Sequence, residues 1–321
     1  MVWDVTCLGD LVIDLAPHSV SDGKRLYAPH PGGAPGNVAV GLARLGRKSL
    51  MIAKLGDEAF GQMIAETLRR QGVDTAGVSF TGEARTRLSV VTLDCAGERD
   101  FIFYGDKPAD LLISAEDILP AFVDGSSILH LGGLLMAGPQ SLAAQKKAID
   151  LARARGRLIS VDPNFRPPLW AGREAMLLAG RYLVAEAAIV KLSEEELLAL
   201  APGQTIEVAA RSLWHDNLKL MAVTRGAAGA LMLTQDQTYS CGGFHVEAVD
   251  TTAAGDAFMA SLLSGLLDIG LDFAAEDRMA SILRQACAAG ALAATRKGAM
   301  ESLPKPEDIA HLLRTGCENS V

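Results

Sequence analysis

Residues 250–264 read D-T-T-A-A-G-D-A-F-M-A-S-L-L-S, and the fold of the chain is organised around them. From Ala257 onward, apolar and small residues recur at helical spacing, whereas residues 244–249 alternate loosely between apolar and polar. This pattern predicts a strand that runs through a turn into a helix. The small residues 253–255 leave backbone N–H groups unobstructed, and the first N–H groups of a helix have no intrahelical partner. Together with the positive end of the helix dipole, they predict an anion-binding site.

Asp256 is the unexpected member of this site, because a carboxylate repels an anion. Its presence makes sense if it removes a proton from a nucleophile that attacks a phosphoryl group held by the amides. Asp is also a common capping residue at the start of a helix, and capping is its more frequent role at such positions. From this stretch alone, both interpretations of Asp256 stay open.

The composition limits the class of protein. Of 321 residues, 49% are hydrophobic and 21% are charged, which indicates a globular core. The net charge of −8 argues against a nucleic-acid partner and against an anionic membrane surface. The five cysteines show no C-x-x-C spacing and fit reduced thiols. Since neither a signal-type N-terminus nor an apolar run of about 20 residues is present, we expect a cytoplasmic protein.

The first strand is expected at residues 5–15, interrupted by Gly9 and Asp10. Asp14 lies near its end, where a carboxylate facing a cleft would accept hydrogen bonds from sugar hydroxyls. A plain turn residue is the alternative, since a carboxylate buried in mid-sheet is costly without hydrogen bonds. The following residues, 17–30, are rich in turn formers and predict a hairpin or flap.

A second glycine-rich turn, P-G-G-A-P-G-N at residues 31–37, leads into an apolar helical pattern at 38–45. Gly32 and Gly33 allow the backbone to approach a ligand closely. Asn37 can both donate and accept hydrogen bonds, although it could equally serve as a helix N-cap. Neither G-x-G-x-x-G nor G-x-x-x-x-G-K-[ST] is present, which excludes the dinucleotide and Walker interpretations. An uncharged, amide-rich turn suits a polyhydroxylated ligand.

Elsewhere, strand patterns alternate with helix patterns, which predicts a mostly parallel sheet covered by helices on both faces. A predicted hairpin at 88–104 interrupts the alternation and suggests a second, smaller sheet. We expect the main strands at 49–55, 127–131, 157–161, 188–191 and 220–224, and helices at 58–70, 139–155 and 283–295. The last helix is alanine-rich and should pack tightly on the helix within 250–264, with Pro304 ending the ordered unit.

Polar residues follow three of these strands, at 162–164, 193–196 and 224–229. They should meet at one sheet edge, where open α/β sheets bind ligands. Turn chemistry and favourable first-turn charges would explain the same residues without a ligand. One carboxylate at 194–196 could hold Mg²⁺ through water. No histidine or cysteine spacing supports a transition-metal site, and no G-x-S-x-G elbow supports a hydrolase.

Taken together, these motifs resemble the ribokinase-like (PfkB) carbohydrate kinases. P-G-G-A-P-G-N-V-A-V-G-L-A-R-L-G, with G-D-E-A-F-G behind it, is similar to the first signature of that family, and D-T-T-A-A-G-D-A-F to the second. The motifs G-D-L-V-I-D-L, F-I-F-Y-G-D-K-P-A-D, D-P-N-F-R, K-L-S-E-E-E-L, V-T-R-G-A-A-G-A and T-R-K-G-A occur in family order. The resemblance covers essentially the whole chain and is strongest to the fructokinase branch.

The resemblance implies a three-layer α/β fold with a small β-sheet lid made of residues 12–30 and 84–108. It implies one kinase domain at 1–314, a tail at 315–321, and a homodimer formed through the lid. The implied reaction is transfer of the γ-phosphate of ATP to a sugar hydroxyl, first of all fructose to fructose 6-phosphate. A ribokinase, a 2-keto-3-deoxygluconate kinase or another sugar or nucleoside kinase is the alternative, and a non-catalytic sugar or nucleotide sensor is a further one.

Site roles are also implied by the resemblance. Asp256 becomes the general base, and the backbone amides of Ala253, Ala254, Gly255 and Asp256 form the anion hole. Substrate contacts fall on Asp14, Gly32, Gly33, Asn37, Phe103 and Arg166. ATP contacts fall on Asn164, Lys191, Glu196, Thr224, Gly226, Gly229 and Gly255, with Glu196 holding Mg²⁺ through water and the helix around 287–290 near the adenine. A K⁺ site is implied at Asp250, Thr252, Ala293, Arg296, Gly298 and Ser302, partly through backbone carbonyls.

Two departures from the family pattern stand out. The usual G-A-G-D is A-A-G-D here, with Ala253 first, a variant that ribokinases share. The usual F-Y-R of fructokinases is Phe103-Tyr104-Gly105, so an arginine that could face the substrate is absent. An arginine there would suit the carboxylate of 2-keto-3-deoxygluconate, so its loss argues against an acidic sugar and weakens the fructose assignment.

Overall fold

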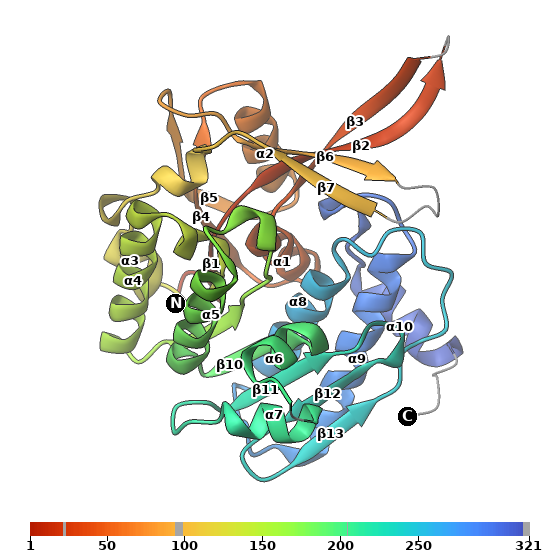
Figure 1. Ribbon diagram of the computed structural model, residues 1–321. Coiled ribbons are helices and arrows are strands. Elements are labelled where there is room, and N and C mark those ends of the chain that lie inside the picture. The colour runs from red at the N-terminus through yellow and green to blue at the C-terminus, as the bar shows by residue number, and fades with distance from the viewer. Residues whose placement is uncertain (22–23, 94–98, 204, 317–321) are drawn as a thin grey trace.

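A large, mostly parallel sheet forms the centre of the protein (Figure 1). The computed structural model describes residues 1–21, 24–93, 99–203 and 205–316. Within them, nine strands follow the order β13-β12-β11-β10-β9-β8-β1-β4-β5. The strands from β11 to β5 are parallel, and β12 and β13 extend that edge antiparallel. Their bounds are β1 Val5–Leu8, β4 Ser49–Gly56, β5 Asp74–Thr81, β8 Ile128–Gly132, β9 Leu158–Asp162, β10 Ile189–Ser193, β11 Leu220–Thr224, β12 Ala230–Leu233 and β13 Thr238–Cys241.

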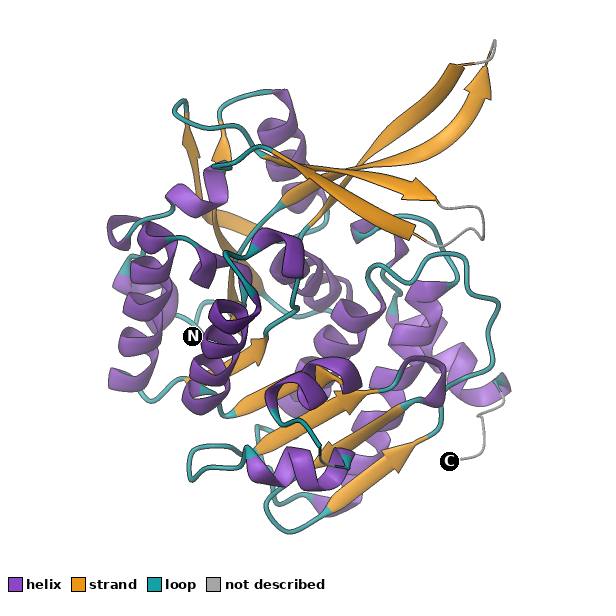
Figure 2. Ribbon diagram, viewed as in Figure 1, coloured by secondary structure: helices purple, strands orange, loops and turns teal. Residues whose placement is uncertain are grey.

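Helices cover both faces of this sheet, which gives three layers (Figure 2). Successive strand residues point to opposite faces, so in β11 Leu220 and Ala222 join one buried cluster whereas Met221 and Val223 join the other. The predicted three-layer, mostly parallel architecture is therefore confirmed. One cluster contains α1 Ala34–Arg44, α2 Ala59–Arg70, α8 Ala254–Asp268, α9 Glu276–Ala294 and α10 Pro306–Thr315. The other contains α3 Pro120–Asp124, α4 Pro139–Ala154, α5 Arg173–Glu186, α6 Glu194–Leu200 and α7 Ile206–Ser212.

A second sheet of four strands, which we call the lid sheet, projects from one end of the molecule (Figure 1). Its order within the described residues is β3-β2-β6-β7, and its central pair, β2 and β6, is parallel while the outer pairs are antiparallel. The strands are β2 Val12–Ser21, β3 Lys24–Gly32, β6 Arg87–Leu93 and β7 Arg99–Tyr104. The small sheet predicted from these two segments is thus present, whereas the predicted turn at 95–98 lies outside the described residues.

The single strand predicted at 5–15, with an interruption at Gly9 and Asp10, is in fact two strands of different sheets. The chain leaves β1 of the central sheet at Leu8 and enters β2 of the lid sheet at Val12. A side chain at Gly9 would overlap the ring of Pro35, so the start of α1 packs against the backbone at the point where the chain changes sheets. Asp14 is the third residue of β2 and pairs with His30, so the alternative of a turn residue is also wrong.

The predicted strand immediately before residue 250 is absent from the described structure. Between β13 and α8 the chain has irregular backbone, with a single isolated bridge at Phe244. Phe244, Val246 and Ala248 line a pocket, which explains why apolar residues alternate here without forming a ladder. An alternating pattern signals one buried face, and a loop over a cavity can supply that face as well as a sheet can.

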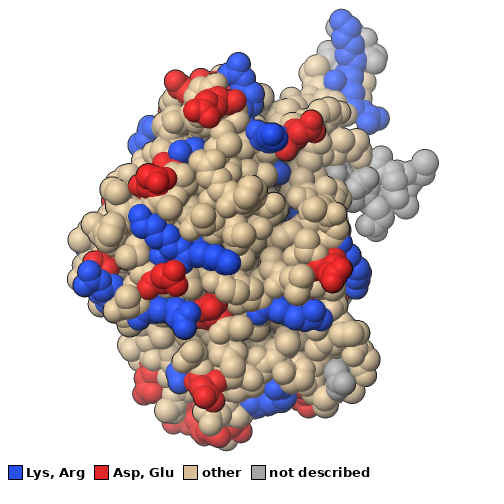
Figure 3. Space-filling view, turned by 60° about the vertical axis from the view of Figure 1, so that its left-hand side comes forward, with Lys and Arg blue, Asp and Glu red and all other residues tan. Residues whose placement is uncertain are grey.

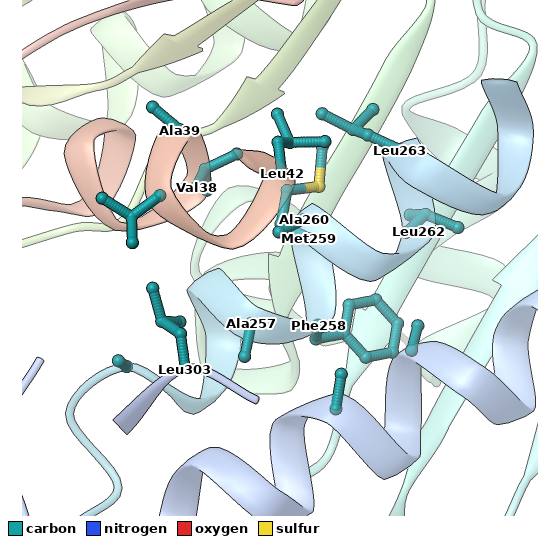
Figure 4. Packing of buried hydrophobic residues seen from close by; sticks show 14 of the residues in the cluster. Val38, Ala39, Leu42, Ala257, Phe258, Met259, Ala260, Leu262, Leu263 and Leu303 are labelled. Carbon is teal, nitrogen blue, oxygen red and sulfur yellow. The ribbon is translucent and has the colours of Figure 1, made fainter. Parts of the chain in front are cut away.

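The core contact between α1 and α8 is close because both helices carry small residues (Figure 4). A Cβ added at Gly41 would lie 2.6 Å from the Cβ of Ala260, and one at Gly290 of α9 would lie 3.1 Å from the carbonyl oxygen of Ala254. The predicted tight packing of the alanine-rich helix on α8 is therefore confirmed, although α9 already begins at Glu276.

Pro304 does not end the ordered unit, contrary to the prediction. It is followed by α10, whose Ile309 is buried against the core cluster, and this helix extends to Thr315, one residue into the predicted tail. None of the helices in the described ranges is both long and apolar enough to cross a membrane. On the face seen in Figure 3, basic and acidic side chains are interspersed, without a continuous patch of one sign.

Candidate active site

Three adjoining pockets lie where the carboxyl ends of the parallel strands meet α8 and the lid sheet. The polar pocket, between α1, α8 and the lid sheet, is lined by Asp10, Asp14, Asn37, Arg87, Arg166 and Asp256 among others. The middle pocket is lined by residues that include Asn164, Arg166, Lys191, Glu196, Thr224 and Asp256. The apolar pocket is lined by Gly226, Phe244, Val246, Phe258, Cys287 and Ala291, with others. The predicted edge of the sheet is thus the edge that carries the cavities.

The pockets form a series because neighbours share residues. Asp256 and Thr252 line both the polar and the middle pocket, and Thr224 and Gly255 line both the middle and the apolar pocket. A ligand with a polyhydroxyl group, a charged centre and an apolar end would fit the three in this order. Asp256 lies at the first junction.

The Asp256 side chain is buried and bonded across helices. It is the third residue of α8, whose N-cap is Ala253, and its Oδ2 accepts a hydrogen bond of 2.7 Å from Nδ2 of Asn37. Asn37 lies within the first turn of α1, where its backbone N–H donates to the carbonyl of Gly33 at 2.8 Å. The alternative in which each residue only caps its helix is wrong for both. Oδ1 of Asn37 is buried and has no partner among the described residues, which leaves an acceptor beside Asp256.

The surroundings of Asp256 favour a carboxyl group that exchanges its proton near neutral pH. Burial and, to a smaller extent, the nearby carboxylate of Asp162 raise the pKa of Asp256, the hydrogen bond from Asn37 lowers it, and the resulting pKa is about 7. A carboxyl group with such a pKa, at the junction of two pockets, is suited to general acid–base chemistry.

The start of α8 offers backbone donors next to that carboxylate. The amides of Ala254 and Ala257 bond to Thr251 and Ala253, but within the described residues the N–H groups of Gly255 and Asp256 have no acceptor. Position 255 requires glycine because an added Cβ would lie 2.9 Å from Nζ of Lys191. The predicted anion site therefore combines free amides at a helix start with a lysine.

Lys191 itself is buried in an ion pair. Its Nζ lies 2.9 Å from Oδ2 of Asp162, and both side chains are almost fully buried. Burial lowers the pKa of Lys191, but the carboxylates of Asp162 and Glu196 outweigh this effect and hold the pKa above its ordinary value. Lys191 is therefore a fixed cation in the wall of the middle pocket.

Glu196 anchors the D-P-N-F-R loop. Its Oε1 accepts from the amide of Phe165 at 2.7 Å, and its Oε2 accepts from the amide of Ser193 at 2.8 Å in a capping box. The first-turn interpretation of this glutamate is therefore correct, and the residue also lines the middle pocket. Asn164, in the same loop, adopts a left-handed φ of 47° and lines two pockets. The described residues hold no cluster of three metal-ligating side chains.

The residues predicted to bind K⁺ lie around two loops, one directly before α8 and one directly after α9. Asp250 joins these loops through hydrogen bonds. Its Oδ1 accepts from the amide and the hydroxyl of Thr252, at 3.0 and 2.6 Å, and its Oδ2 accepts from the amide of Gly298 at 3.0 Å. The backbone carbonyl of Ala293 accepts from the amide of Arg296 at 3.3 Å, and buried Ser302 donates to the carbonyl of Ala299. The two loops therefore meet directly ahead of α8.

The other predicted residues are distributed over the pockets. Gly33 and Phe103 line the polar pocket, Ala254 and Gly229 line the apolar pocket, and Ala253 is buried at the helix start. Gly32 lines none of these three pockets. A Cβ at this glycine would lie 3.1 Å from Oδ2 of Asp14. Its small size therefore leaves room for the Asp14 carboxylate.

Sequence reasoning missed Asp10, Arg87 and Asp110. Asp10 lies two residues beyond β1, so the rule applied to the other strands, that polar residues follow strand ends, would have found it. Arg87 is buried in the polar pocket and lies 2.8 Å from Asp110. Asp110 ends the motif F-I-F-Y-G-D-K-P-A-D, whereas no sequence pattern marks Arg87. Although position 105 is glycine, the polar pocket contains arginines, namely Arg87 and Arg166.

The chain is similar to known carbohydrate kinases along nearly its full length. The model of the pfkB family of carbohydrate kinases matches residues 3–306. Fructokinase-2 of Solanum habrochaites is 38% identical over 317 residues, which are 97% of this chain and 96% of the relative. The structure of fructokinase from Xylella fastidiosa with bound ATP has a TM-score of 0.88 and 30% identity, covering 98% of this chain and 99% of that one. A double mutant of fructokinase from Vibrio cholerae, bound to fructose, ADP and potassium, has a TM-score of 0.88 and 35% identity, covering 97% and 98%.

Proposed function

Because the chain belongs to the pfkB family of carbohydrate kinases, we propose that it transfers the γ-phosphate of ATP to the 6-hydroxyl of fructose, with Asp256 as the general base. The names of the relatives and of the solved structures support fructose as the acceptor. The observation that carries the proposal is the place of Asp256 at the junction of the polar and middle pockets. A sugar hydroxyl in the first pocket and a phosphoryl group in the second would meet at this carboxylate.

In the polar pocket, the sugar would be held by Asp14 and by the free Oδ1 of Asn37, with the backbone at Gly33 close to the ring. Asp256 accepts the proton of the attacking hydroxyl as its oxygen bonds to the γ-phosphorus and the bond to the β,γ-bridging oxygen breaks. The amides of Gly255 and Asp256 stabilise the charge that develops on the phosphoryl oxygens.

In the middle pocket, Lys191 provides positive charge and Asn164 a polar side chain beside the phosphates. Glu196 would hold Mg²⁺ through water, and the ion would neutralise the charge that passes to the leaving ADP. The apolar pocket, with Phe244 and Phe258 in its wall, fits the adenine ring. Gly226 and Gly229, which the resemblance assigns to a nucleotide loop, line the same cavity, and this supports the proposal.

We also propose that K⁺ binds at the loops joined by Asp250. The donors would be Asp250, Thr252, Ser302 and the carbonyls of Ala293, Arg296 and Gly298. The structure of the Vibrio cholerae fructokinase double mutant has potassium bound, which supports the choice of ion. Since these loops lead into α8, a bound ion would fix the amides that receive the phosphoryl group.

A homodimer through the lid sheet is the assembly that we propose. Large hydrophobic side chains are exposed on three of the lid strands, β2, β3 and β7: Val20, Leu26, Tyr27, Ile102 and Tyr104. Exposed apolar side chains gathered on one projecting element are typical of an interaction site. Sedimentation analysis of the protein and of the variant Tyr27→Lys/Tyr104→Lys tests the proposal, which predicts a dimer for the first and a monomer for the second.

ADP release in the presence of ATP, Mg²⁺ and K⁺ tests the proposed reaction against fructose, ribose, glucose, 2-keto-3-deoxygluconate and adenosine. We expect the highest kcat/KM with fructose. A higher value with another compound would retain the kinase and discard fructose as the substrate. Folded protein that releases no ADP with any of the five would favour a non-catalytic sensor.

A further inference from the structure

Arg87 lines the polar pocket but has no role in the reaction proposed above. It is the first residue of β6 and is only 4% exposed. Ser89, two residues further along the strand and therefore on the same face, donates a hydrogen bond to Asp14. Arg87 and Asp14 line the same pocket, so this face of the lid sheet forms its wall.

Asp110 holds the guanidinium of Arg87 in a defined orientation. Nε and Nη2 of Arg87 both donate to Oδ2 of Asp110, at 3.1 and 2.8 Å, and Asp110 is 1% exposed. One edge of the planar guanidinium is thereby occupied. Among the described residues, no hydrogen bond uses the remaining nitrogen, Nη1. Asp110 does not itself line the pocket, so it acts through Arg87.

The charged residues around Arg87 favour a neutral ligand over an anionic one. Asp10, Asp14 and Asp256 line the polar pocket together with Arg87 and Arg166, and Asp110 neutralises Arg87 from behind. The positive charge of Arg87 also lowers the pKa of Asp10, against the burial that raises it. The pocket therefore has no surplus of positive charge for a carboxylate, but it has donors and acceptors for several hydroxyl groups.

Gly105, at the position where the resemblance to fructokinases implies an arginine, lies next to Arg87. Leu88 of β6 is opposite Tyr104 of β7, so the next residues along the two strands are Arg87 and Gly105. A Cβ at Gly105 would meet no atom within 4 Å. In this chain, the guanidinium that this part of the lid sheet supplies to the polar pocket is therefore that of Arg87, on the neighbouring strand β6.

We propose that Arg87 is a substrate-binding residue that donates through Nη1 to a hydroxyl group of a neutral sugar, and that Asp110 is the positioning residue that orients it. This inference rests on the proposed sugar kinase function. It adds Arg87 as a specificity determinant to that function.

The test compares Arg87→Ala with the double variant Arg87→Ala/Asp110→Ala. The single variant leaves the Asp110 carboxylate buried without its partner, whereas the double variant removes both members of the pair and restores a stable lid sheet. For each protein, the KM values for fructose and ATP are measured by ADP release, and the Kd for fructose is measured by calorimetry without nucleotide.

We expect the KM and Kd for fructose to rise by about 10- to 100-fold in both variants, as for loss of a charge-assisted hydrogen bond, with the KM for ATP changed less than about threefold. A purely structural role would restore the wild-type KM and Kd in the double variant, which would overturn the inference. Unchanged fructose affinity in the single variant would also overturn it. If the wild type binds fructose but releases no ADP, the proposed reaction fails while the Kd comparison still decides the role of Arg87. If the wild type does not bind fructose, the proposed reaction and the proposed role of Arg87 are both wrong.

Discussion

Nδ2 of Asn37 donates a hydrogen bond of 2.7 Å to Oδ2 of Asp256, and this contact links two segments 219 residues apart. The two side chains meet because α1 and α8 pack closely (Figure 4). A Cβ added at Gly41 would lie 2.6 Å from the Cβ of Ala260. The first glycine-rich turn is thereby placed against the second. The contact is also the point at which the polar and middle pockets join.

Asn37→Ala should shift the pH dependence of the reaction. Catalysis requires ionised Asp256, whose pKa is about 7, so kcat/KM for fructose in the wild type should fall about tenfold per pH unit below this value. The hydrogen bond from Asn37 lowers this pKa, so its removal raises the pKa and moves the acid limb to higher pH. The plateau of kcat/KM should fall by about 10- to 100-fold. The measurement is kcat/KM from pH 5.5 to 9. An acid limb at the same pH in both proteins would contradict the assignment.

Asp256→Asn should stabilise the protein at high pH. Because burial raises the pKa of Asp256 from 3.8 to about 7 in the folded state, the native protein binds this proton more tightly than the unfolded chain does. Its contribution to stability is therefore present below pH 4 and is lost as the pH rises towards 7. Because Asp256→Asn is uncharged at every pH, it does not undergo this loss of unfolding free energy, which is on the order of a few kcal/mol.

Thermal unfolding at pH 5 and pH 8 measures the effect. The gain in Tm of Asp256→Asn over the wild type should be larger at pH 8, by about 5 °C. Asp236→Asn, which changes an exposed aspartate, is the matched control and should show the same Tm as the wild type at each pH. A gain that is independent of pH would show that burial of the charge is not its cause.

The interior strands were predictable from sequence, and the edge strands were not. β8 and β11 are buried along their length between two helical layers, and so they read as short apolar runs. β5 lies at the edge of the central sheet with several exposed residues, and it shows no such run. The alternation at Phe244 was misleading because a pocket, instead of a sheet, covers its apolar side chains.

Some residues of the candidate site could likewise be predicted from the sequence, and others could not. Asn164 and Thr224 follow strand ends, where topology alone brings polar residues together, and both line the pockets. The meeting of Asn37 and Asp256 depends on how two helices pack, which neither local pattern contains. Arg87 begins a lid strand, and only the tertiary structure shows that this strand faces the polar pocket.

Lys191→Met should destabilise the protein and abolish turnover. It leaves Asp162 as a buried carboxylate without a cation, and Oδ1 of Asp162 already has no partner among the described residues. The expected loss is about 3–5 kcal/mol in the free energy of unfolding, measured with urea. The double variant Lys191→Met/Asp162→Ala should recover most of the stability but not the activity, because Lys191 also lines the middle pocket. Recovery of turnover in the double variant would show that Lys191 has only a structural role.

Asp250→Asn should remove activation by K⁺. The Asp250 carboxylate joins the loop before α8 to Gly298, and the proposed ion needs its negative charge. In the wild type, we expect kcat to rise by about 10-fold when K⁺ replaces Na⁺ at constant ionic strength, whereas the variant should respond less than twofold. Turnover that is the same in Na⁺ and K⁺ for the wild type would remove the proposed K⁺ site.

The most direct test of the account is the kcat of Asp256→Asn with saturating fructose, ATP, Mg²⁺ and K⁺. If Asp256 removes the proton of the sugar hydroxyl, kcat falls by about 100- to 10,000-fold, while the KM values for fructose and ATP stay within about threefold of the wild type. A variant that retains kcat within tenfold of the wild type would show that the carboxylate between the two pockets is not the general base.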